Sequence, residues 1–281
     1  IKSSAASDVY KRQISRNIVV NIPIVADAKT ALDEMLTHAA AVKSDAWVKS
    51  IDEWKKEIPI TMSGYEGMTP EKIINKINDL FPDSIVTTDV GQNQLWTTQY
   101  IRMDGKRQFL TSGGLGTMGY GLPAAIGASI GNPGNPVICI SGDGGAQMNI
   151  QELATAHALE TPVILCIFNN TYLGNVKQMQ KMFYNKRYSS TCLRYSRSCN
   201  RQCRIDGTCT GGDYVPDFVK LAESYGCTGI RVENEAQMDE AFKRAAENTK
   251  SVTLIEFMLD CEYDVYPMVP GGAALSDMMF G

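Results

Sequence analysis

Two polar motifs of this chain directly follow short apolar segments that have the length of buried strands. The Gly-Asp-Gly-Gly motif of residues 142–145 follows the apolar segment 137–141, and Asn169-Asn170 follows the apolar segment 163–168. The interval between the motifs is long enough for one crossover helix and a return strand. Because the carboxyl ends of parallel strands meet at one edge of a sheet, we expect both motifs to lie close together there.

The oxygen atoms in and near these motifs suit a divalent metal ion. Magnesium prefers about six oxygen ligands and takes one or two from the protein, leaving the others to phosphate and water. Asp143 offers an anionic oxygen, Asn170 a neutral one, and the backbone carbonyl of Tyr172 a third. Glycines beside Asp143 let a diphosphate approach the backbone, and a helix beginning near Asn149 would add partial positive charge. The sequence therefore predicts a site for magnesium and a diphosphate.

Alternating strand-like and helical segments must position these motifs. Strands are expected at 84–88, 110–112, 137–141, 163–168, 229–232 and 252–258, and helices at 70–80, 121–130, 149–159, 216–225 and 235–247. The stretch between the fourth strand and the fourth helix is expected to be irregular. Val- and Ile-rich strands that alternate with helices predict an α/β fold, a parallel sheet flanked by helices on both faces.

The residues before this pattern are too few to bury a core of their own. They hold one strand-like run, 19–25, and one helical segment, 28–41, with Asp27 as its expected cap. We interpret them as a short remnant of a preceding α/β domain. The start of the chain contains DVYKRQ, which resembles a translated sequencing adaptor and is left out of fold reasoning. The expected organisation is artefact or disordered sequence at 1–13, a domain tail at 14–42, a linker with a short helix at 43–68, and the main domain at 69–281.

Composition excludes several classes of function. A net charge of −4 without a sustained basic run argues against a nucleic-acid surface, and no apolar run is long enough to cross a membrane. His38 and His157 are the two histidines, so histidine triads and metal–histidine clusters are poorly supported and a bound cofactor is expected to supply the chemistry. The cysteines do not resemble a secreted disulfide framework, and the cytoplasm is the expected location.

Four cysteines lie in an insertion at 192–212 among Arg, Asn and Gly residues. Their spacing does not form the paired Cys-x-x-Cys pattern of structural zinc sites. A surface loop is the favoured interpretation, and a metal-binding or redox role stays open. The cysteines concerned are Cys192, Cys199, Cys203 and Cys209.

Beyond the two strand-end motifs, the chain resembles the C-terminal part of acetolactate synthase catalytic large subunits. The resemblance covers most of the chain and is carried by GQNQLW at 91–96, SGGLGTMGYGLPAA at 112–125, the segment 173–189 and PMVPGGAAL at 267–275. It implies the thiamine-diphosphate-binding fold, with Mg²⁺ and thiamine diphosphate as cofactors. The implied reaction condenses two 2-keto acids with loss of CO₂, giving 2-acetolactate from pyruvate, the first common step of branched-chain amino-acid biosynthesis.

The resemblance also implies roles for individual residues. Asp143, Asn170 and the carbonyl of Tyr172 would bind Mg²⁺, Met118 would lie beneath the bent cofactor, and the carbonyl of Gly116 would accept a hydrogen bond from the aminopyrimidine. The family usually has His where Asn93 stands, and Asn93 is expected to donate a hydrogen bond to the diphosphate. The implied cofactor-binding set is Gly91, Gln92, Asn93, Gly116, Thr117, Met118, Gly142, Asp143, Gly144, Gly145, Asn170, Tyr172, Leu173, Gly174 and Val176.

Other parts of the family's machinery have no expected counterpart here. The glutamate that moves a proton on the pyrimidine comes from the family's N-terminal domain, so this chain alone is expected to show negligible turnover. FAD binds chiefly through the family's middle domain, and tight binding of FAD is not expected here. Family resemblance further implies a homodimer or higher oligomer and a possible regulatory small subunit.

Two departures bear on the substrate pocket. Asn175 stands where the family has Met, and Met179 stands where it commonly has the Trp that shapes preference for the second keto acid. Pyruvate and 2-ketobutyrate both stay open as second substrates, and Met179 as simple core packing is an equal alternative.

Other functions also stay open. Another thiamine-diphosphate-dependent decarboxylase or carboligase would carry the same motifs. Gly114-x-Gly116-x-x-Gly119 fits a dinucleotide fingerprint and suggests an NAD-dependent dehydrogenase, although the expected ribose-binding acid is missing. A non-catalytic binding module is the third possibility.

Overall fold

A computed structural model of the chain describes residues 5–7, 14–16, 19–194 and 216–280. It divides into two compact units, Ile1–Pro59 and Ile60–Gly281. This division falls inside the segment 43–68 that the sequence suggested as a linker. Within the described residues, no helix combines the length and apolar character needed to cross a membrane.

In the part of the first unit that the structure describes, there are two short strands and two helices. Strand β1 (Ala5–Ser7) pairs in parallel with β2 (Ile22–Ile24), so part of the segment left out of fold reasoning carries a strand. Helix α1 (Ala28–His38) begins where expected, with the Asp27 carboxylate accepting two backbone N–H groups of its first turn at 3.0 and 3.3 Å. Helix α2 (Asp45–Glu57) belongs to this unit and lies within the segment 43–68, where a linker with a short helix was expected.

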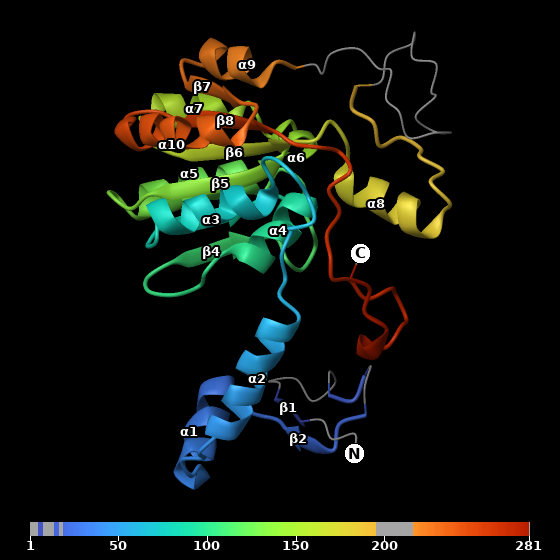
Figure 1. Cartoon of the computed structure of the whole chain (residues 1–281). Coiled ribbons are helices and arrows are strands. Elements are labelled where there is room, and N and C mark those ends of the chain that lie inside the picture. Colours follow the sequence, from blue (N-terminus) through green and yellow to red (C-terminus); the bar gives the residue numbers. More distant parts are fainter. Residues whose placement is uncertain (1–4, 8–13, 17–18, 195–215, 281) are drawn as a thin grey trace. The chain divides into compact units, whose positions relative to one another are not determined.

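The second unit is built on a six-stranded parallel sheet with the order β4-β3-β5-β6-β8-β7 (Figure 1). Helices lie on both of its faces, which confirms the predicted fold class. Its strands are β3 (Ile85–Thr88), β4 (Gln108–Thr111), β5 (Val137–Gly142), β6 (Ile164–Asn169), β7 (Thr228–Val232) and β8 (Thr253–Met258). Its helices are α3 (Pro70–Leu80), α4 (Gln92–Tyr100), α5 (Gly121–Gly131), α6 (Asp143–Ala146), α7 (Glu152–Ala158), α8 (Gly174–Phe183), α9 (Phe218–Ser224) and α10 (Met238–Glu247), with 3-10 turns η2 (Glu235–Gln237) and η3 (Leu275–Asp277).

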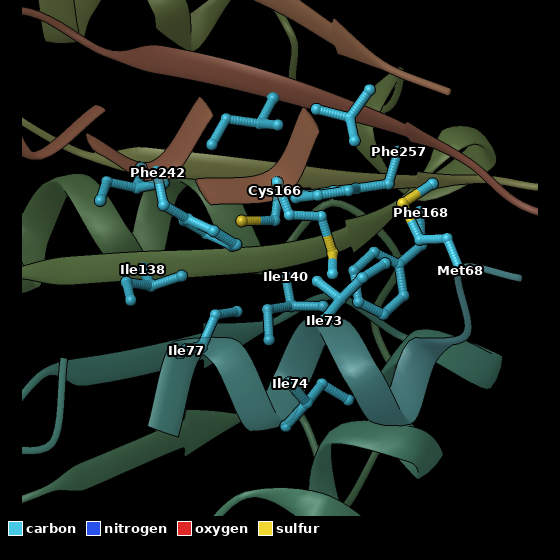
Figure 2. Packing of buried hydrophobic residues seen from close by; sticks show 14 of the residues in the cluster. Met68, Ile73, Ile74, Ile77, Ile138, Ile140, Cys166, Phe168, Phe242 and Phe257 are labelled. Carbon is cyan, nitrogen blue, oxygen red and sulfur yellow. The ribbon is translucent and has the colours of Figure 1, made fainter. Parts of the chain in front are cut away.

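Each face of the sheet has its own apolar cluster, as expected for strands buried on both sides. On one face, α3 and α10 cover alternate strand residues, and Figure 2 shows Ile73 and Ile77 of α3 pointing toward Ile138 and Ile140. On the other face, α5, α7 and α9 cover the intervening strand residues, among them Leu165. The sheet is therefore a rigid, fully covered platform whose strand ends remain available for binding.

The strand order reverses direction between β3 and β5. From β3 the chain passes to β4 on one side, and then returns to β5 on the other side of β3. In open α/β sheets, ligands bind beyond the carboxyl ends of strands at such a switch point. The segments that follow β3 and β5 are the places where a ligand is expected.

Two helices next to these strand ends were not predicted. Helix α4 follows Gly91, where no helix was expected, and α8 lies in a stretch that we expected to be irregular. The helix expected at 149–159 is α7, which begins three residues later at Glu152, and the additional short turn α6 begins at Asp143 itself. The Asn149 amide donates to the Gly119 carbonyl at 2.8 Å.

Candidate functional site

A pocket of about 150 Å³ opens at the carboxyl ends of β3, β5 and β6. The first turns of α4, α6 and α8 contribute lining residues, so three helix N-termini, each carrying partial positive charge, surround one cavity. This is the surrounding that an anionic group requires. The lining residues are Val90, Gly91, Gln92, Asn93, Trp96, Met118, Gly142, Asp143, Gly144, Gly145, Phe168, Asn170, Tyr172, Leu173, Gly174, Asn175 and Val176.

The Asp143 carboxylate is buried in this pocket with one oxygen unsatisfied. Its Oδ1 accepts the backbone N–H of Gly144 at 2.8 Å, whereas Oδ2 has no hydrogen-bond partner. Burial raises the pKa of Asp143 to about 7, and the Gly144 N–H opposes that rise. A buried anionic oxygen without a partner is costly unless a cation or proton meets it. The pocket therefore fits a metal ion at Asp143.

Asn170 reaches the same pocket from the end of β6, as the strand order predicts. Its Oδ1 accepts the N–H of Tyr172 at 3.1 Å and keeps a second lone pair. Between them Thr171 has φ of 62°, in the left-handed region that a β-branched residue rarely adopts, at a cost of roughly 1–3 kcal/mol. This strained turn places both Asn170 and Tyr172 at the lining of the pocket.

The oxygens gathered here match magnesium better than zinc. The described residues contain no cluster of three or more His, Cys, Asp and Glu side chains able to hold a metal. One carboxylate, one amide and one backbone carbonyl leave the remaining positions to phosphate and water, which is the ligand set that Mg²⁺ favours. Zinc would require nitrogen or sulfur ligands.

Gln92 has a role that the sequence did not suggest. Its Nε2 donates to Gln178 Oε1 at 3.0 Å and to the Tyr263 carbonyl at 3.1 Å, while its Oε1 accepts from Asn170 Nδ2 at 3.2 Å. Gln178 in turn bonds both backbone groups of Val265 at 2.9 Å. The Gln92 side chain thus orients Asn170. Gln92 can offer a diphosphate only its backbone N–H, at the start of α4.

Asn93 also differs from its expected role as a donor to the diphosphate. Both hydrogens of its Nδ2 are used, on the carbonyls of Asp89 at 3.1 Å and Ile140 at 3.0 Å. These bonds hold β3 and β5 together at the switch point. The Asn93 Oδ1 lies on the side of Gly91 and Gly142, so this side chain presents an acceptor there and cannot donate to a phosphate.

Three glycines are required by close approach at this pocket. Gly91 has φ of 139°, which lets the backbone turn from β3 into α4. A Cβ on Gly174 would overlap Gln92 Oε1 and lie 2.7 Å from Asn170 Nδ2, and a Cβ on Gly144 would lie 2.7 Å from Leu173 Cδ2. Larger residues would therefore displace the side chains that surround Asp143.

The structure brings most of the predicted residues together, and three lie elsewhere. Gly116 and Thr117 are exposed and do not line the pocket, although a Cβ on Gly116 would be 3.8 Å from its lining residue Val90. Met179 lines a neighbouring cavity of about 260 Å³ together with Asn175, which also lines the first pocket. Asn175 therefore lies on the lining of both cavities.

Several supporting residues were missed by sequence analysis. Asp89 follows β3, Asn169 ends β6 and Glu256 lies within β8; all three are buried polar residues, and each is hydrogen-bonded to a segment of the site. The signal for Glu256 was available, because it is the one charged residue in the strand segment 252–258. A charge inside a buried strand requires a specific partner.

Fold and site together define an α/β domain with a pocket at a sheet switch point, lined by helix starts and by the Asp143 carboxylate. Residues 89–257 match the family described as "Thiamine pyrophosphate enzyme, C-terminal TPP binding domain". The chain belongs to this family. The match covers the glycine-rich segment 112–119, so the family match accounts for this segment without the dehydrogenase alternative.

Similar proteins include acetolactate synthase large subunits. The chain is 38% identical to the "Probable acetolactate synthase large subunit" of Methanococcus aeolicus, over 97% of this chain and 45% of that protein. It is 35% identical to the "Acetolactate synthase large subunit" of Cyanidium caldarium, over 97% and 44%. It is also 35% identical to "Acetolactate synthase isozyme 3 large subunit" of Escherichia coli, over 96% and 46%. The chain therefore spans less than half the length of these relatives.

Proposed function

We propose that this chain is the cofactor-binding part of an acetolactate synthase catalytic subunit, which joins two 2-keto acids with loss of CO₂. The similarity to three large subunits supports this proposal. The single observation that carries the cofactor role is the buried Asp143 carboxylate, whose Oδ2 lacks a partner in a pocket that Asn170 and Tyr172 also line.

Mg²⁺ is proposed to be held by Asp143, the Asn170 side chain and the Tyr172 carbonyl. The backbone N–H groups at the starts of α4 and α8 would bind diphosphate oxygens. Met118, which lines the same pocket, would support the bent shape of the cofactor. Bound thiamine diphosphate would supply a nucleophilic carbon, and its positively charged ring would take up the electrons released by decarboxylation.

The residues of this chain would then position substrate and exclude water. The cavity at Met179 lies next to the cofactor pocket through Asn175, and we propose that it receives the second 2-keto acid. Because an unbranched Met side chain fills less space than Trp and can adapt its shape, both pyruvate and 2-ketobutyrate would fit. For the whole protein, and not for this chain alone, we propose that it binds FAD, forms an oligomer and associates with a regulatory subunit.

The cytoplasm is the proposed location. Cys139, Cys166, Cys227 and Cys261 are free thiols, which suits a reducing compartment.

Calorimetric titration of the full chain tests the cofactor proposal. Thiamine diphosphate is expected to bind with Mg²⁺ and to lose its affinity when Mg²⁺ is removed with EDTA, whereas NAD⁺ is expected to show no binding. Thiamine diphosphate binding that is equally tight with and without a divalent ion would contradict the role of Asp143. The chain alone is expected to form negligible acetolactate from pyruvate, and robust formation would show that it contains its own proton shuttle.

A further inference from the structure

A buried ion pair on the outer strands of the sheet is connected to the metal turn. Glu256 in β8 is 2% exposed, and its Oε2 accepts from Arg231 Nε in the neighbouring strand β7 at 2.8 Å. The two residues are direct cross-strand partners. Arg231 also donates to Asp217 at the N-terminus of α9, at 2.8 Å. A buried carboxylate held this way keeps one oxygen, Oε1, for another partner.

Glu256 Oε1 binds Asn169, the residue that precedes the proposed metal ligand Asn170. Asn169 Nδ2 donates to Glu256 Oε1 at 2.7 Å, and Asn169 Oδ1 accepts the N–H of Thr171 at 3.0 Å. Asn169 is 1% exposed, so its amide has no solvent alternative. The Asn169 side chain therefore links the ion pair to Thr171, the residue whose backbone is in the left-handed region.

The orientation of the Asn169 amide is fixed by charge. Glu256 can only accept hydrogen bonds, so Nδ2 must face it and Oδ1 must face the turn. Arg231 neutralises Glu256, which keeps a second negative charge near Asp143 from being uncompensated. The Thr171 N–H is thereby held in the direction that presents Asn170 and Tyr172 to the pocket.

We propose that Glu256, with Arg231 behind it, is a positioning residue for magnesium: it orients Asn169, which holds the turn at Thr171 in the form that presents the metal ligands. This inference rests on the proposed function and adds to it a role for strands β7 and β8. Groups that orient metal ligands typically change metal affinity by about 10–100-fold when they are altered.

Three variants of the full chain test the contact between Asn169 and Glu256 by exchanging the amide and the carboxylate between the two positions. In Asn169→Asp, the new carboxylate faces the carboxylate of Glu256. In Glu256→Gln, the new amide NH₂ faces a hydrogen-bond donor, either that of Arg231 or that of Asn169. Each single variant is expected to need at least about 10-fold more Mg²⁺ for binding of thiamine diphosphate. The double variant Asn169→Asp with Glu256→Gln restores all three hydrogen bonds at the original total charge. Because the negative charge then lies on residue 169, away from Arg231, the double variant is expected to recover part of the wild-type Mg²⁺ dependence.

A matched control separates positioning from general loss of stability. Phe242 is fully buried on the opposite face of the sheet, and Phe242→Leu should destabilise the chain without altering the Mg²⁺ dependence. Calorimetry at a series of Mg²⁺ concentrations gives the binding curves. Amide hydrogen exchange of Thr171 in the ligand-free chain gives a second readout, expected to be faster in both single variants and near wild type in the double variant and in the control.

The outcomes distinguish this inference from the proposed function. If the wild-type chain does not bind thiamine diphosphate with Mg²⁺, both are overturned. If the wild type binds but the single variants show its Mg²⁺ dependence, or if the double variant is no better than the singles, the positioning role alone is overturned. Equal shifts in the single variants and in Phe242→Leu would also overturn it, since they would reflect stability only.

Discussion

Both carboxylate oxygens of Asp89 accept the backbone N–H of Gly119, at 2.9 and 3.0 Å. The same carboxylate accepts the N–H of Val90 at 2.7 Å and the hydroxyl of Ser141 at 3.3 Å. A Cβ on Gly145 would lie 2.7 Å from its Cγ, so the turn after β5 packs directly on it. One buried side chain thus joins the end of β3, the end of β5 and the glycine-rich segment that carries Met118.

Asp89→Asn should destabilise the chain, because the amide places a donor where backbone N–H groups already point. A buried donor left without an acceptor costs about 1–3 kcal/mol, and we expect a loss of that size in chemical denaturation followed by circular dichroism. Asp79→Asn is the matched control, since its carboxylate is 63% exposed and changes at such sites stay within about 0.5 kcal/mol. Equal stability of the two variants would show that the Asp89 contacts are not needed.

Asp143→Asn is expected to separate stability from binding. The ligand-free wild type holds a buried carboxylate oxygen without a partner, and a neutral amide removes the cost of that charge. The variant should therefore unfold at a denaturant concentration no lower than wild type, while Mg²⁺-dependent binding of thiamine diphosphate is lost. Denaturation and calorimetry on the same preparation test this. A large loss of stability would mean that the carboxylate supports the fold instead of a ligand.

Gly174→Ala and Gly127→Ala add the same methyl group, but we expect different results: weaker binding in the first variant and a more stable helix in the second. At Gly174 the Cβ would overlap Gln92 Oε1 and crowd Asn170 Nδ2, so the affinity for Mg²⁺ with thiamine diphosphate should fall at least about 10-fold. At Gly127, within α5, the Cβ would meet nothing within 4 Å. There the change should stabilise the helix by about 0.5–1 kcal/mol and leave binding unchanged.

Comparison of these two glycine variants needs both calorimetry and denaturation. Wild-type affinity in Gly174→Ala would show that the Gln92–Asn170 contact does not position the metal ligand. Loss of binding in Gly127→Ala would show that the binding measurement responds to changes remote from the pocket.

The sheet could be predicted from sequence because its strands are short apolar runs separated by amphipathic helices. Helix α3 was predicted at its observed bounds, since Pro70 occupies the first turn and Ile73, Ile74 and Ile77 repeat at helical spacing. Asp143 and Asn170 were predicted to meet because they follow consecutive strands. β5 and β6 do pair, and both residues line one pocket.

Other features depend on tertiary contacts that periodicity does not reveal. Helix α4 begins after Gly91 and has no clear apolar face, so its sequence resembles a polar loop. The donors of Asn93 are used by carbonyls of two strands, which only the pairing of β3 with β5 determines. The insertion cysteines Cys199, Cys203 and Cys209 lie outside the described residues, and their role stays a prediction.

Lys177 supports the segment beyond β8 and offers a final prediction. Its side chain is 4% exposed, and its Nζ donates to the Cys261 carbonyl at 2.7 Å and to Glu262 Oε1 at 2.5 Å. The same ammonium lies 4.8 Å from the ring centre of Tyr172 and 5.6 Å from that of Tyr188. Burial is the largest single effect on the pKa of Lys177 and lowers it, but the hydrogen bond to Glu262 and the charges of neighbouring groups together raise it by more, so the net shift is upward. Lys177 therefore keeps its positive charge, which the Cys261 carbonyl and Glu262 bind.

Lys177→Met keeps an unbranched apolar side chain and removes the charge. Because hydrogen bonds to charged groups contribute about 1.5–3 kcal/mol, we expect a stability loss of that order and faster amide exchange over residues 261–265. Lys49→Met is the control: Lys49 pairs with Glu53 at 3.8 Å and its side chain is 78% exposed, so its loss should cost about 1 kcal/mol or less. If both variants were equally stable, the burial of Lys177 beside the two tyrosine rings would have no energetic consequence.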